Sequence, residues 1–178
     1  MPYHTITPQD LVDGLVRWVR AEHPVISVVS TRTGGWQGWA AAQFTYWLGA
    51  SLGDPADLDV ESGVTATAVG GTAVFDNPAR TADLVFNALS APADGVPPVI
   101  VVALRCQRVR QTQSRFRACL TQDLTKLGGI SDELRRRYRD RGVVGLSLGV
   151  CFATTPAPEG HHVVAAGDEL AVQWRSTP

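Results

Sequence analysis

The residues that could do chemistry lie on two apolar segments that follow one another in the chain. RTADLVFNAL (80–89) carries a carboxylate at Asp83, and VIVVALRCQRV (99–109) begins as an apolar run and ends in polar groups. Side chains alternate across a β-strand, so one face of the second segment carries Ala103, Arg105 and Gln107. A guanidinium that faces a carboxylate on the adjacent strand can form a bidentate ion pair with it. The same groups could instead clamp the carboxylate or phosphate of a ligand.

Two interpretations of this polar row stay open. In the first, Asp83, Arg105 and Gln107 form an ordinary buried ion pair capped by an amide, kept because removing one partner would strand a charge. In the second, they face a ligand or substrate in a cleft. Cys106 points away from the row if the alternation holds, so we expect it to fill space as a small apolar residue.

Two helices precede these strands. Thr7 can cap a helix over 8–22, because apolar residues recur there at helical spacing after a proline at the first position. A second proline is expected to end that helix, and the β-branched segment VISVVST (25–31) predicts a strand. Another helix is predicted over 36–52, where Gln43 is a rare polar residue within an apolar stripe.

The remainder of the chain continues the alternation of helices and strands. A strand or hairpin is predicted over 59–74, with its turn at Gly70 and Gly71. The loop between 80–89 and 99–109 predicts that these two segments are antiparallel neighbours in a sheet. The later predicted elements are a helix over 111–129, a helix capped by Ser131 or Asp132, a buried strand over 143–154 and a final strand over 169–174. This order indicates an α/β fold with a mixed sheet.

With this order of elements, the chain resembles the PD-(D/E)XK nuclease-like superfamily. Members of that superfamily carry an Asp on one strand and, after a short loop, a strand that ends in an acid, any residue and a Lys. Many carry a Gln two places beyond the Lys, and some carry a Glu on the helix before the sheet. The resemblance covers roughly residues 36–154. It implies a restriction-endonuclease-like α-β-β-β-α-β core, in which helices flank a mixed central sheet.

The superfamily's site positions are only partly filled here. Asp83 matches the metal-binding Asp and Gln107 the Gln, whereas Ala103 stands at the second acid, Arg105 at the Lys and Gln43 at the helix acid. Mg²⁺ takes oxygen ligands, and an alanine side chain offers none. An arginine keeps the positive charge but does not give up its proton in proteins. We therefore expect no metal at this remnant of a nuclease site, and a direct bond from Arg105 to Asp83 in its place.

We expect a single domain over 1–178. It comprises the nuclease-like core at about 36–154, the N-terminal helix at 8–22 and a C-terminal strand extension over 155–178.

The composition restricts the partners and the compartment. The net charge of −1 gives no general attraction to phosphate backbones, so we expect no nucleic-acid partner. No apolar stretch approaches the roughly 18 residues of a membrane span, and no secretory signal is apparent, so we expect a cytoplasmic protein with no membrane partner. The three cysteines lack metal spacing and are expected to be reduced thiols.

These features favour a catalytically inactive pseudo-nuclease domain that needs no cofactor. It would act in protein binding, assembly or regulation, with a second copy or a larger protein as its partner. One alternative is an enzyme with altered chemistry, which would use the old cleft for a small anionic molecule oriented by Asp83, Arg105 and Gln107. Another is a divalent-metal-dependent nuclease in which Glu61 or Asp76 replaces the missing acid.

Overall fold

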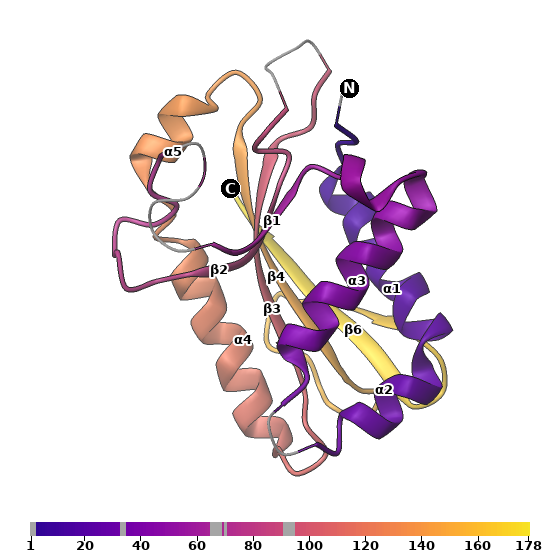
Figure 1. Cartoon of the computed structure of the whole chain (residues 1–178). Coiled ribbons are helices and arrows are strands. Elements are labelled where there is room, and N and C mark those ends of the chain that lie inside the picture. The colour runs from indigo at the N-terminus through magenta and orange to yellow at the C-terminus, as the bar shows by residue number, and fades with distance from the viewer. Residues whose placement is uncertain (1–2, 33–34, 65–68, 70, 91–94) are drawn as a thin grey trace.

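The computed structural model describes residues 3–32, 35–64, 69, 71–90 and 95–178. Its centre is a six-stranded mixed sheet in the order β1-β2-β3-β4-β6-β5. The strands are β1 (Val60–Val64), β2 (Ala82–Phe86), β3 (Val99–Cys106), β4 (Val143–Phe152), β5 (His162–Ala165) and β6 (Leu170–Thr177). The helices are α1 (Pro8–Ala21), α2 (His23–Val29), α3 (Gln37–Leu52), the 3₁₀ turn η1 (Pro55–Asp57), α4 (Gln113–Leu127) and α5 (Asp132–Arg137). Figure 1 shows α1, α2 and α3 on one side of the sheet and α4 and α5 on the other.

The predicted α-β-β-β-α-β order is confirmed by α3, β1, β2, β3, α4 and β4, with the short turn η1 after α3 and the short helix α5 after α4. β1, β2 and β3 form an antiparallel meander, as expected for β2 and β3 from the loop that joins them. β3 pairs in parallel with β4 along the full length of β3, from Val99↔Val143 to Cys106↔Val150, and α4 and α5 lie in the crossover between them. A parallel pair needs such a crossover because the chain must return to the same end of the sheet.

The two faces of the sheet have separate apolar cores. On one face Leu84 and Leu104 pack in the cluster that holds Leu15 of α1 and Phe44 of α3. On the other face Val101 and Ala103 pack in a cluster with Leu127, at the end of α4. Alternation along β3 therefore sends successive side chains to different helices. None of the helices in the described part of the chain combines the length and apolar character that crossing a bilayer would need.

The helix ends show which local signals were reliable. Thr7 caps α1, with its hydroxyl accepting a hydrogen bond from the Asp10 N–H, and Ser131 caps α5 in the same way. Both caps confirm the predictions. The predicted strand over 25–31 is wrong, because this segment forms most of α2. Pro24 lies in the first turn of α2, where a missing N–H costs no hydrogen bond, so it begins a helix there.

The segment 59–74 was predicted as a strand or a hairpin, and the strand is confirmed by β1, which pairs with β2. Of the predicted turn, Gly71 lies in a short segment with an antiparallel bridge between Val69 and Thr72, and Gly70 lies outside the described residues. The edge strand β5 was not predicted. All four of its residues are exposed, so it lacks the apolar alternation that indicates a half-buried strand.

A candidate anion-binding site at the end of β3

The C-terminal part of β3 is free of its antiparallel neighbour. Backbone pairing with β2 stops at Leu84↔Val102. Beyond that point the Asp83 side chain, not the backbone of β2, bonds to β3. One Asp83 carboxylate oxygen accepts a hydrogen bond from the Leu104 N–H at 2.9 Å, and the other accepts one from Gln37 Nε2 at 2.8 Å. Asp83 thus joins the start of β2 to β3 and to the first turn of α3.

The predicted bond from Arg105 to Asp83 is wrong. The Arg105 guanidinium donates to both carboxylate oxygens of Asp123, from Nε at 2.7 Å and from Nη2 at 2.8 Å. Alternation directs Arg105 to the face covered by α4, and Asp123 lies on the buried side of that helix. Lys126 Nζ is 3.8 Å from the same carboxylate. The pair is bidentate, as predicted for Arg105, but its partner comes from a helix.

The electrostatics of the pair keep Arg105 charged. The hydrogen bond to Asp123 raises the pKa of Arg105, burial opposes that rise, and the charges of Asp123 and Asp83 add to it. Asp123 has only 2% of its side chain exposed, whereas Arg105 has 35%. A buried carboxylate therefore binds the Arg105 guanidinium through Nε and Nη2, and the side chain remains partly exposed to solvent.

The other predicted site residues are not gathered around Asp83. Ala103 is fully buried in the apolar cluster on the α4 face. Gln43 is exposed on α3, which packs on the opposite face, so it is not the helix residue of this site. Gln37, the first residue of the same helix, contacts Asp83 instead.

Gln107 has a structural role within the described network. Its Oε1 accepts hydrogen bonds from the Phe152 N–H at 3.1 Å and from Thr155 Oγ1 at 2.8 Å, and its carbonyl accepts one from Trp36 Nε1 at 3.0 Å. The side chain is buried and ties the end of β3 to the end of β4. Its hydrogen bonds go to neither Asp83 nor Arg105, so the prediction that this amide caps their ion pair is wrong.

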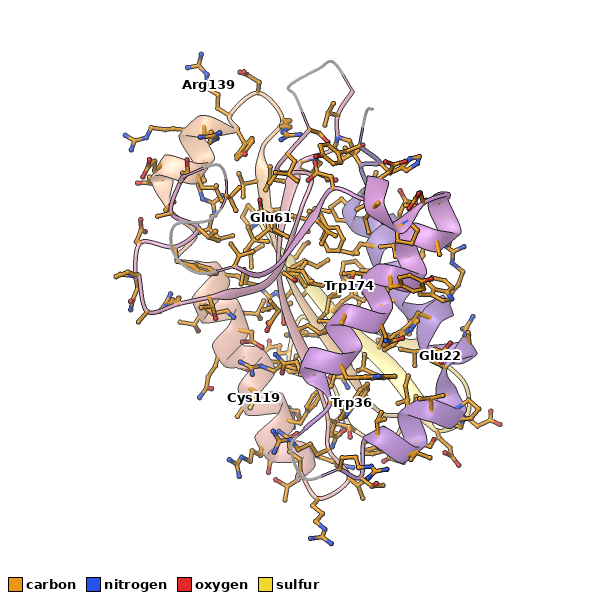
Figure 2. The ribbon with its side chains drawn as sticks, viewed as in Figure 1. Glu22, Trp36, Glu61, Cys119, Arg139 and Trp174 are labelled. Carbon is orange, nitrogen blue, oxygen red and sulfur yellow. The ribbon has the colours of Figure 1, made fainter. Side chains whose placement is uncertain are left out.

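A pocket opens beside Arg105. It has a volume of about 470 Å³ and lies between the end of β3, the loop that follows it and the first turns of α4. Four guanidinium side chains line it: Arg105, Arg108, Arg110 and Arg115. Gln37 and Cys119 also lie in the wall, and Figure 2 shows Cys119 on α4 toward the lower end of the molecule. Among the described residues in this wall there is no Asp or Glu side chain. We call this site the arginine pocket.

Sequence reasoning missed Asp123 and most of the arginine pocket. A signal for Asp123 was present, since it falls on the buried stripe of α4 together with Phe116, Leu120 and Leu127. A carboxylate in such a stripe requires a cationic partner. The arginines after β3 carried no comparable signal, because they are exposed side chains in an irregular loop.

The carboxylates considered as replacement metal ligands lie elsewhere. Glu61 is on β1, opposite Val85, and Figure 2 shows it well above Cys119. Burial, and to a smaller extent the charge of Asp59, raises the pKa of Glu61. Asp76 is exposed, and its N–H donates to the Gly129 carbonyl. Across the described residues, no three His, Cys, Asp or Glu side chains gather closely enough to hold a metal ion.

Comparisons with known proteins leave the nuclease resemblance as a prediction. The chain matches no protein-family model, no curated protein and no solved structure.

Proposed function

We propose that this chain is a catalytically inactive, nuclease-like domain that binds a small phosphate-bearing anion in the arginine pocket. The observation that carries the proposal is a pocket of about 470 Å³ whose described wall holds four arginines and no carboxylate. Its role would be binding or regulation without phosphodiester cleavage. A protein partner that responds to the bound anion stays a prediction.

The donor set beside Asp83 does not suit a divalent metal. Each Asp83 oxygen already accepts a hydrogen bond, from Leu104 or from Gln37. Ala103 supplies no ligand, and a guanidinium at Arg105 would repel a cation nearby. The role that a metal has in a nuclease, neutralising phosphate charge, would fall here to arginine side chains.

The same groups suit an oxyanion. A guanidinium presents N–H donors in a planar fork that matches phosphate oxygens. The charge of Arg105 is balanced by Asp123, so the surplus positive charge comes from Arg108, Arg110 and Arg115. Thr112, also in the wall, caps the N-terminus of α4, where the helix dipole favours negative charge.

Cys106, next to Arg105 on β3, gives no support to covalent catalysis. Cys106 is buried, and burial raises the pKa of its thiol well above the usual value. A neutral thiol is a poor nucleophile. Binding is therefore the simpler use of the pocket.

Calorimetric titration with inorganic pyrophosphate in metal-free buffer tests the proposal. We expect saturable binding to the wild-type chain and a loss of affinity of about tenfold in Arg115→Gln, which removes one charged hydrogen-bond donor. Arg117→Gln is the matched control, because Arg117 is also exposed on α4, two residues away, and is not in the pocket wall. Equal affinity in the two variants, or no binding to the wild type, would refute the proposal.

A further inference from the structure

A second pocket lies at the opposite end of the central strands. It has a volume of about 410 Å³ and lies between Ala88–Ser90, which follow β2, and four residues of the segment before β4: Arg137, Tyr138, Asp140 and Arg141. The arginine pocket is at the end of β3, whereas this one is where β3 and β4 begin. We call it the Tyr138 pocket.

Arg141 in its wall has a charged group without a partner. All three guanidinium nitrogens are shielded from solvent, and none has a hydrogen-bond acceptor among the described residues. The guanidinium carbon lies 4.8 Å from the centroid of the Tyr138 ring. Tyr138 is itself held in place, since its hydroxyl donates to the Ala88 carbonyl at 2.9 Å. A cation–π contact offsets only part of the cost of removing a cation from water.

The other polar groups of the wall are already engaged. Arg137 donates to Thr72 Oγ1 at 3.1 Å, and Ser90 Oγ donates to the buried carboxylate of Asp59. Asp140 is exposed and lies 3.5 Å from Arg139. Among the described residues of the wall, Arg141 is therefore the charged group that lacks a hydrogen-bond acceptor and that an anion could pair with.

We propose that the Tyr138 pocket binds a monoanionic carboxylate with an apolar body. One carboxylate would match one unpartnered guanidinium, and Asp140 at the wall disfavours a second negative charge. Leu89, 45% exposed, and the Tyr138 ring supply an apolar surface for the body of the ligand. Because these nitrogens are shielded from solvent, the proposal requires the Arg141 side chain to turn toward the pocket when the carboxylate enters. This site is independent of the arginine pocket, which suits a multiply charged phosphate.

Benzoate is the probe for this site. In ¹⁵N-labelled protein, we expect benzoate to shift the Arg141 Nε–H resonance saturably and to raise the melting temperature of the wild type. Arg141→Gln should lose the rise in melting temperature. Arg139→Gln, the matched control, should keep both effects, because Arg139 is 81% exposed and is not in the pocket wall. Figure 2 shows its side chain extending away from the body of the molecule.

The melting temperature of Arg141→Gln without benzoate and the benzoate affinity of Arg141→Lys also test the proposal. Without benzoate, Arg141→Gln should melt at the wild-type temperature or higher, because it removes an uncompensated charge. A clear drop would mean that Arg141 is a structural partner of Tyr138 and would overturn the proposal. Arg141→Lys keeps the charge without the fork, so it should bind benzoate more weakly than the wild type but detectably. Benzoate effects that persist in Arg141→Gln, or that phosphate reproduces more strongly at Arg141, would also overturn it.

Discussion

Asp83 makes structural hydrogen bonds at the position where the nuclease resemblance predicts a metal ligand. At a nuclease site it would hold a metal ion, but here its two oxygens satisfy the Leu104 N–H and the Gln37 amide. Leu104 is 1% exposed, so its N–H could not form a hydrogen bond with water if the Asp83 carboxylate were removed. A buried donor without an acceptor is costly, which gives Asp83 a structural reason to remain.

Substitution of Asp83 tests this structural role. Asp83→Ala should lower the free energy of unfolding by about 1–3 kcal/mol, because it leaves the Leu104 N–H unsatisfied. Asp83→Asn keeps an acceptor oxygen and should recover most of that loss. Urea denaturation of the two variants and the wild type measures the difference. An alanine variant as stable as the wild type would show that the Leu104 bond contributes nothing.

At the scale of elements, α4 is the helix that positions the arginine pocket. It carries Arg115 in the wall and Asp123 beneath Arg105. Its approach to β4 depends on Gly149, where a β-carbon would meet the Phe116 and Leu120 side chains at 3.1 Å. Contact at that distance is tighter than packed cores accept without movement, so the glycine sets how close the helix lies.

A larger side chain at Gly149 should therefore move α4. Gly149→Val is expected to lower the free energy of unfolding by about 1–3 kcal/mol through overpacking and to weaken pyrophosphate binding as well. Gly38→Ala is the control, because a β-carbon there meets nothing within 4 Å. It should be neutral or up to about 1 kcal/mol more stable, since alanine favours the helix. Unchanged stability and binding in Gly149→Val would contradict this packing argument.

At the scale of the whole molecule, the net charge does not indicate the local cluster of arginines in the arginine pocket. The chain has a net charge of −1, yet four arginines line one pocket and the acids lie elsewhere on the described surface. A near-neutral total argues against general attraction to polyanions, but it does not limit a local site. The selectivity of the protein would therefore come from where its arginines gather.

The local patterns predicted the order of elements better than the contacts of the site. Helical spacing and caps at Thr7 and Ser131 predicted four of the helices, because these signals act within one or two turns. Strand alternation correctly grouped Ala103 with Arg105 on the α4 face. It could not identify Asp123 as the partner, because that depends on how α4 is rotated and shifted against the sheet. The prediction of Gln43 at the site was wrong for the same reason, since the α3 residue that contacts Asp83 is Gln37.

The titration that tests the central claim most directly compares pyrophosphate binding to the wild-type chain with and without Mg²⁺. If arginine side chains bind the anion, pyrophosphate binds in metal-free buffer, and Mg²⁺ leaves the affinity unchanged or lowers it by complexing the ligand. Binding that requires Mg²⁺ and disappears in Asp83→Ala would contradict the account, because it would show that Asp83 still holds a metal ion.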